Sequence, residues 1–193
     1  MNSDERILYR INNQDEIVFV SENWDCFALN NDAPHLTSKD VTGKSLWSFV
    51  TDVTTEQLYR EIIRKARTGQ TMRFNFRCDS PELCRAMEMI ITVSVEGDVQ
   101  FETQTLGIEE RPSQMILKSG LPRGKHMLSI CGWCKKILTG ENVWEEIEKA
   151  VSYLRLFEDK SRLPQLTHGI CIACFQEMSA KLQEKRLSET TKE

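Results

Sequence analysis

The sequence has no long apolar stretch, no strongly basic segment and few histidines, three in 193 residues. Its strictly apolar runs are short, as at residues 17–20, whereas a membrane-spanning helix needs about 20 apolar residues. Lys and Arg number 25 against 29 Asp and Glu, so no excess of positive charge is available to bind phosphates. These absences argue against a membrane-spanning helix and against a nucleic-acid partner.

Familiar catalytic motifs are absent as well. The sequence contains no glycine-rich phosphate-binding pattern, no HExxH zinc-hydrolase pattern and no GxSxG nucleophile pattern. His35 and His126 stand alone, and neither has an orienting partner that would make it a general base. Residues 1–6 are polar and lack the basic-then-apolar order of a signal peptide. We therefore expect a cytoplasmic binding protein that is not an enzyme.

The composition is that of a folded protein, with 40% hydrophobic and 28% charged residues. A chain of this length accommodates one domain and a small appendage. Residues 109–124 contain two prolines and two glycines, which cannot sustain a helix or a central strand. The predicted divisions are a first domain at 5–110, a linker at 111–125, a cysteine-rich module at 126–185 and a flexible tail at 186–193.

Residue periodicity predicts an α+β first domain. The expected order is two strands, three helices and three strands, which favours an antiparallel five-stranded sheet with helices on one face. Ser21 is expected to cap the first helix, Thr54 and Gln57 stand at capping-box spacing before the third, and Gly69 ends it. The predicted strands are residues 7–11, 16–20, 71–78, 87–95 and 99–105, and the predicted helices are residues 21–29, 45–49 and 54–68.

The module at 126–185 is expected to be small and mainly helical. Apolar residues between Val143 and Leu154 follow a helical stripe, with two acidic residues near its start. A second helix is predicted to begin near Cys171 and to run through Leu182. From Lys185 onward the apolar stripe ends, so the chain is expected to fray.

The strongest motif is a pair of C-x-x-C sequences, at Cys131 and Cys134 and at Cys171 and Cys174, with 36 residues between the pairs. Two residues between cysteines let one tight turn aim both thiolates at a single ion, and two such turns complete a tetrahedron. Four protein ligands predict a structural Zn²⁺ site, since a catalytic zinc keeps one position open; iron is an alternative ion. His168 is a candidate alternative ligand or a partner of a bound thiolate, or a plain turn residue.

A redox role is the alternative reading. A C-x-x-C pair at a helix start can exchange disulfides, so Cys131 and Cys134 would serve a thiol-based redox enzyme or redox sensor. The second pair would then have no purpose, and this favours the metal site. Seven cysteines cannot all pair as disulfides. Cys26 and Cys78 are expected to pack in the core.

Six short stretches carry a resemblance: ENW at residues 22–24, SLWSF at 45–49, FRCDSP at 76–81, MEM at 87–89, CGWCKK at 131–136 and THGIC at 167–171. With them, the chain resembles a bacterial family that joins a PAS-like sensor domain to a C-terminal cysteine module. The resemblance implies a sensory or regulatory protein of a signalling pathway, in which the first domain binds a small ligand, a protein partner or a second copy of itself. The ligand is not specified by the sequence. Candidate pocket residues are Trp24, Phe27, Trp47, Phe74, Phe76, Met87 and Met89.

Overall fold

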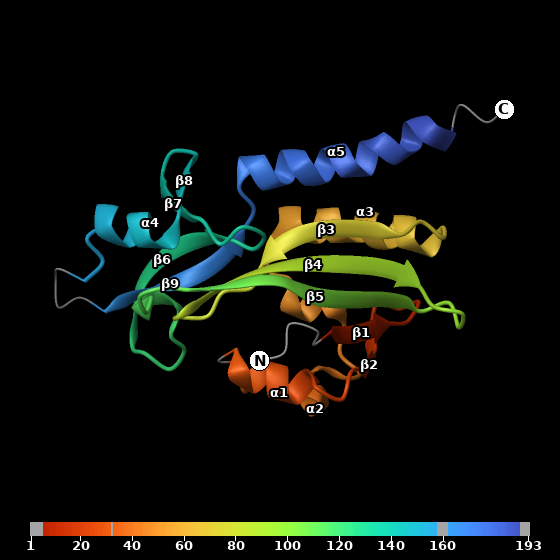
Figure 1. The fold of residues 1–193 in the computed structure, drawn as a ribbon, viewed down its shortest axis with the longest axis horizontal. Coiled ribbons are helices and arrows are strands. Elements are labelled where there is room, and N and C mark those ends of the chain that lie inside the picture. The colour runs from red at the N-terminus through yellow and green to blue at the C-terminus, as the bar shows by residue number, and fades with distance from the viewer. Residues whose placement is uncertain (1–5, 32, 158–161, 190–193) are drawn as a thin grey trace.

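The structure, a computed structural model, describes residues 6–31, 33–157 and 162–189, with side chains described up to residue 183. Two β-sheets lie next to each other along the long axis of the molecule (Figure 1). The first half of the chain builds a five-stranded sheet, and the second half builds a four-stranded sheet. The last helix begins between them and extends back above the larger sheet (Figure 1).

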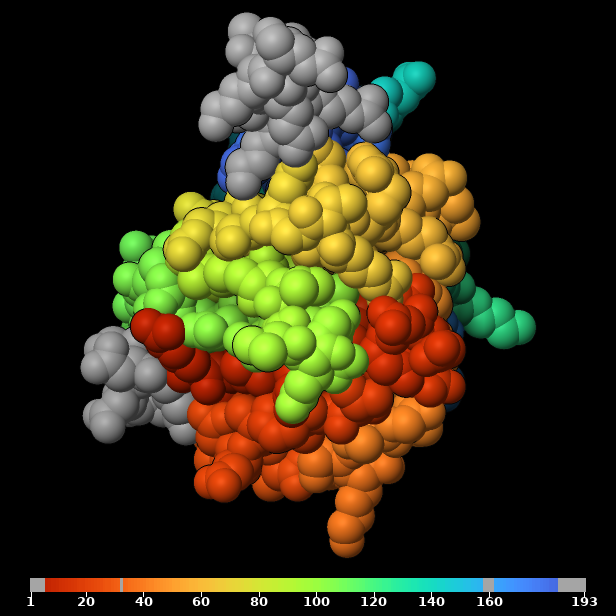
Figure 2. All heavy atoms as spheres, turned by 90° about the vertical axis from the view of Figure 1, so that its right-hand side faces the viewer, coloured from red at the N-terminus to blue at the C-terminus, as the bar shows by residue number. Residues whose placement is uncertain are grey.

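The larger sheet has the strand order β2-β1-β5-β4-β3, and every neighbouring pair in it is antiparallel. This confirms the α+β architecture with a five-stranded antiparallel sheet. An ion pair of 2.6 Å between Arg10 and Glu96 joins the first strand to the turn between the last two, at the end that Figure 2 views. The strands are β1 (Ile7–Ile11), β2 (Ile17–Val20), β3 (Met72–Arg77), β4 (Leu83–Val93) and β5 (Val99–Glu110).

Helices of the first half lie between the second and third strands of the chain, as expected. The helix that contributes most to the core, α3, packs its buried residues Leu58, Ile62 and Ile63 against the sheet. Alternate residues of β3 and β4 complete this core, since Phe74 and Met89 are buried opposite one another. The helical segments are α1 (Trp24–Asn30), α2 (Ser38–Val41), the 3₁₀ helix η1 (Leu46–Phe49) and α3 (Val53–Arg67).

Two predicted helix caps are wrong, and the short helix α2 was not foreseen. Helix α3 begins one residue after Asp52, whose carboxylate accepts the Thr55 backbone N–H at 2.7 Å, so the residues at capping-box spacing lie inside the helix. Ser21 caps no helix, because its hydroxyl accepts the backbone N–H of Leu8 at 3.1 Å. Gly69 does follow the end of α3, with a φ of 86° that favours glycine.

The second half of the chain is less helical than expected. It contains a sheet of order β8-β7-β6-β9 in which β6 and β9 are parallel. The apolar stripe that predicted one helix in fact covers two elements, because Val143 and Trp144 lie on a strand and the helix begins at Ile147. The elements are η2 (Met115–Leu117), β6 (Arg123–Cys131), β7 (Ile137–Gly140), β8 (Val143–Glu145), α4 (Ile147–Tyr153), β9 (Leu163–Gly169) and α5 (Ile172–Glu189).

The predicted linker at 111–125 and the predicted flexible tail at 186–193 both contain regular secondary structure. The segment 111–125 contains η2 and the first residues of β6. Within the segment 186–193, helix α5 continues to Glu189, and residues 190–193 lie outside the described residues. In the described part of the chain, no helix combines the length and the apolar character needed to cross a membrane.

The two halves share one hydrophobic core. Cys131, Trp133 and Met178, from the second half, belong to the same buried cluster as Phe74 and Leu58. A smaller cluster inside the second half is formed by Ile116, Ile130, Ile137, Ile147 and Ala150. The larger core therefore continues into the module that carries the cysteine motifs.

Candidate metal centre

The two C-x-x-C motifs meet because parallel neighbouring strands end at the same edge of a sheet. Strands β6 and β9 run parallel with Cys131 paired to Gly169, and each strand leads directly into one motif. The backbone N–H of Gly132 donates to the Gly169 carbonyl at 2.8 Å, which fixes the two strand ends against each other. The two motifs, which are separated by 36 residues in the sequence, therefore lie next to each other in space.

The first motif forms a tight turn at the end of β6. The Cys131 backbone N–H donates to the Lys136 carbonyl at 2.8 Å, and the Lys135 N–H donates to the Cys131 carbonyl at 3.0 Å. Lys135 takes a φ of 61°, and its ammonium group donates to the Gly132 carbonyl at 2.9 Å. The turn therefore holds Cys134 beside Cys131, with one cation folded onto it.

The second motif lies at the N-terminus of α5. Cys171 immediately precedes the helix, and its sulfur accepts the Cys174 backbone N–H at 3.4 Å. The Cys171 N–H in turn donates to the Cys131 sulfur at 3.4 Å, which links the two motifs. Backbone N–H donors and the positive end of a helix both favour the ionised thiolate.

The four sulfur atoms of Cys131, Cys134, Cys171 and Cys174 lie within 4.8 Å of one another, a grouping that can hold a metal ion. The Cys134 and Cys171 sulfurs are 3.7 Å apart. Zinc–sulfur bonds of about 2.3 Å in a tetrahedron place the sulfurs about 3.8 Å apart. Cys131 and Cys171 are buried, and the other two are partly exposed. The donor set and its spacing fit a tetrahedral thiolate site.

The protonation of these thiols is coupled through their mutual contacts. Hydrogen bonds from the Cys134 and Cys174 thiols lower the pKa of Cys131 well below its usual range. The contact with Cys131 raises the pKa of Cys134 to about 12 and that of Cys174 still further. Four negative charges cannot gather in this volume without a cation, whereas a bound metal ion deprotonates its thiol ligands.

His168 lies outside this group of four sulfur ligands. Because it lies on strand β9, opposite Ile130 in the register, it is not a turn residue. The residue is exposed. Partial desolvation lowers its pKa, and the charge of Lys135 lowers it further.

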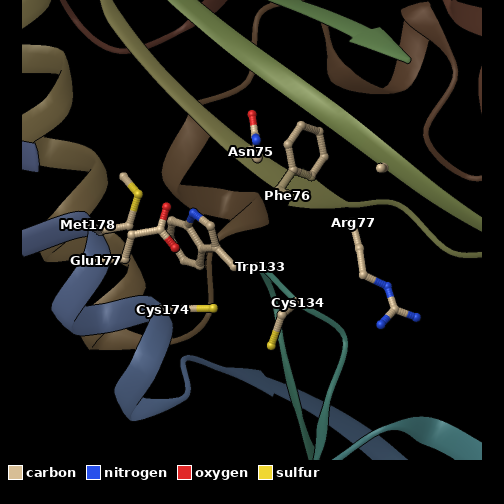
Figure 3. Close-up of a pocket in the computed structure, with 9 residues that line it drawn as sticks. Asn75, Phe76, Arg77, Trp133, Cys134, Cys174, Glu177 and Met178 are labelled. Atoms are coloured by element: carbon tan, nitrogen blue, oxygen red, sulfur yellow. The ribbon is translucent and has the colours of Figure 1, made fainter. Parts of the chain in front are cut away.

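The seven predicted pocket residues divide into two groups. Phe74, Met87 and Met89 are buried, at 2%, 1% and 6% exposure, while the four others are partly exposed. Phe76 alone among the seven lines the hollow drawn in Figure 3, which lies between β3, the first cysteine turn and α5.

Two cysteines outside the group of four were expected to pack in the core. Cys26 is exposed on α1, so its predicted core position is wrong, and Cys78 is partly exposed.

Trp133, inside the first cysteine motif, joins the cysteine turn to the larger sheet. Its ring is 5% exposed and lies 5.5 Å from the Tyr59 ring and 6.2 Å from the Phe74 ring, centroid to centroid. Its carbonyl accepts the Arg77 backbone N–H at 2.6 Å, and burial raises the pKa of Tyr59 to about 12. The sequence motif could have indicated this burial, because a large aromatic side chain between two candidate metal ligands needs an apolar surface to pack against.

Two arginines of the first half add ion pairs to the second half. Arg77 reaches Glu146 at 2.5 Å, next to α4, and Arg111 reaches Glu148 at 3.2 Å. Both arginines also bind Asp79, whose side chain is 1% exposed. Because Asp79 is buried between them, the pairs orient the arginines toward the module.

Arg85 is a buried cation that the sequence analysis missed. It is 1% exposed and donates to the Asn31 amide oxygen, the Cys78 carbonyl and the Ser80 hydroxyl at 2.6–3.3 Å. No carboxylate pairs with it in the described part of the chain, and its Nε has no hydrogen-bond partner there. The sequence could have indicated its burial, because Arg85 lies two residues before Met87 on β4 and therefore faces the same side of the sheet.

Comparison with known proteins finds similarity among solved structures. No protein family matches the sequence, and no curated protein matches it. Among solved structures, 14 chains match, one of which is the crystal structure of a sensory box sensor histidine kinase from Vibrio cholerae. That match has 15% sequence identity and a TM-score of 0.39, and it covers 54% of this chain and 84% of the other. A similarity of this size is weak.

Proposed function

We propose that this chain is a sensory or regulatory binding protein whose four cysteines hold a structural Zn²⁺. The observation that carries the proposal is the set of four sulfurs within 4.8 Å, two of them buried in the core shared with the larger sheet. A site closed by four protein ligands has no open position for a reacting water, so the metal stabilises structure and does not catalyse. Tetrahedral four-thiolate sites hold zinc or iron, and we propose zinc because it is the usual ion of closed four-cysteine sites with a structural role.

The signalling role rests on the resemblance to PAS-like proteins with a C-terminal cysteine module. In this proposal, the protein acts in the cytoplasm of a bacterium by binding a small ligand, a protein partner or a second copy of itself. A reducing compartment suits the site, because the four thiols must remain reduced to bind the metal. The alternative is a redox protein in which a disulfide forms between two of the clustered thiols.

Metal analysis with matched cysteine variants tests the zinc site. We expect one zinc per purified full-length chain, and we expect Cys131→Ser and Cys174→Ser to lose it, because removing one thiolate opens the tetrahedron. Cys26→Ser is the control, since Cys26 is exposed on α1 and outside the group; it should keep the full zinc content. Inductively coupled plasma mass spectrometry on freshly purified protein gives the metal identity.

A thiol count on the same sample separates zinc from redox chemistry. With zinc bound, the exposed Cys26 should react in the native protein faster than the four clustered thiols, which become reactive after chelation. Metal-free protein with a disulfide that forms and reduces reversibly within the group would refute the structural zinc site and favour the redox alternative.

A further inference from the structure

The four clustered cysteines differ in how far they are enclosed. Cys131 and Cys171 are 0% and 3% exposed, and the sulfur of each accepts a backbone N–H at 3.4 Å. Cys134 and Cys174 are partly exposed. Each motif therefore contributes one cysteine that is enclosed by the core and one that borders the surface.

Cys134 and Cys174 together line two hollows. The hollow between β3 and α5 has a volume of about 230 Å³, and Figure 3 shows both sulfurs pointing into the space between the first cysteine turn and α5. The second hollow, of about 410 Å³, lies between Trp144 of β8 and the first turn of α5. A space of about 10–15 Å³ already holds one water molecule. A solute slightly larger than water, such as a peroxide, can therefore reach this pair of cysteines.

A disulfide between Cys134 and Cys174 would connect the two motifs. Their sulfurs lie within 4.8 Å of each other, and a disulfide bond of about 2.0 Å requires them to approach. The movement disturbs the shared core least at this pair, because Cys131 and Cys171 belong to the core and the other two pack against it from outside. Zinc would keep only two of its four ligands, too few to hold it.

We infer that Cys134 and Cys174 form a peroxide-sensitive switch, in which their oxidation to a disulfide releases the zinc. One thiolate attacks a peroxide oxygen, the O–O bond breaks, and a sulfenic acid and hydroxide form. The second thiolate attacks the sulfenic sulfur, the S–O bond breaks, and a second hydroxide leaves. Two electrons pass from the sulfurs to the peroxide, and the two hydroxides take protons from solvent.

The switch rests on the proposed zinc site and names its regulation by an oxidant. It differs from the redox alternative, in which the group never holds a metal. Here zinc occupies the reduced group, and the enclosed thiols of Cys131 and Cys171 stay reduced when zinc leaves. A thiol reductant reverses the change by exchange with the disulfide, which frees four thiols to bind zinc again.

Hydrogen peroxide added to the zinc-loaded full-length protein tests the switch. A zinc-sensitive dye should report release of the ion at the rate at which the disulfide forms, and dithiothreitol with added zinc should restore the metal content. Cys26→Ser is the matched control, because Cys26 is exposed on α1 and outside the group. It should release zinc at the same rate as the parent protein. A clear slowing in Cys26→Ser would make Cys26 the reacting thiol and overturn the inference.

Peptide mapping identifies which cysteines are joined. Trypsin places Cys131 and Cys134 in the peptide 126–135 and the other two cysteines in the peptide 163–181. The predicted disulfide should link these two peptides, with Cys131 and Cys171 labelled by N-ethylmaleimide after unfolding. A disulfide within either peptide, a link through Cys131 or Cys171, or zinc release without a disulfide overturns the inference.

Zinc content measured before the peroxide is added reports on the proposed function separately. Protein that contains zinc but forms no disulfide between the motifs refutes the switch and leaves the structural zinc site in place. Reduced protein that is purified without zinc refutes the structural site, and the switch that depends on it.

Discussion

One buried residue, Arg85, links three separate segments of the first half through its hydrogen bonds. Arg85, a buried residue of β4, has three neutral acceptors and no carboxylate partner within the described residues. A buried cation of this kind is stabilised by hydrogen bonds alone, and the planar guanidinium reaches acceptors in several fixed directions at once. The shape of the side chain, as well as its charge, is therefore required at this position.

We predict that Arg85→Lys lowers the free energy of unfolding by about 2 kcal/mol, because an ammonium group keeps the charge but leaves buried acceptors unpaired. Urea denaturation of the full-length variant measures the change. Arg73→Lys is the matched control, since Arg73 is exposed on β3 and its ion pair with Glu88 is 3.5 Å long; it should change stability by less than about 0.5 kcal/mol. Equal stability of the two variants would contradict the prediction.

At the scale of elements, helix α3 and the parallel strands β6 and β9 place the rest of the structure. Helix α3 covers the larger sheet, and through Tyr59 it contacts the Trp133 ring of the cysteine turn. Strands β6 and β9 bring the two cysteine motifs to one sheet edge. The four-cysteine group is consequently held by elements from both halves of the chain.

The start of α3 offers a test with a closely matched control. Asp52 caps the helix through its carboxylate, so Asp52→Ala should lower the free energy of unfolding by about 1 kcal/mol. Asp52→Asn keeps an oxygen acceptor of similar capping strength and should remain close to the parent protein. Thermal and urea denaturation measure both variants. If alanine and asparagine cause equal losses, the carboxylate does not act as the cap.

At the scale of the whole molecule, the module with the four-cysteine group is continuous with the core of the larger sheet. The shared cluster includes Cys131, Trp133, Cys171 and Met178 together with residues of α3 and β3. The ion pairs of Arg77 and Arg111 surround this junction. Loss of the metal should therefore be felt beyond the module, at the near edge of the sheet.

Chelation followed by hydrogen exchange tests this coupling. Removing zinc should speed amide exchange in β6, β9 and the start of α5, and at the Arg77 amide, which is bonded to the Trp133 carbonyl. The distant strands β1 and β5 should keep their protection, because their pairing does not involve the module. The zinc-saturated chelator is the control. Unchanged protection of β6 and β9 would show that the metal does not stabilise the module.

The sequence determined the features that depend on neighbouring residues. Period-two alternation in β3, β4 and β5 placed three strands, and the turn around Gly97 followed from residue type, with its φ of 91°. The spacing of the cysteines indicated all four members of the sulfur group, because two residues between thiols is a local geometric requirement. Short elements in the second half were harder, since a three-residue strand before α4 shares the apolar period of a helix.

Only the tertiary structure decided how these parts fit together. It placed Trp133 against Tyr59 and Phe74, buried Arg85 without a carboxylate partner in the described chain, and formed the hollow between β3 and α5. These contacts join residues far apart in the chain, and periodicity and spacing describe only residues that are close in it. The sequence by itself therefore determined that four thiols share one site, while the packing of distant elements decided that this site adjoins the core of the sheet.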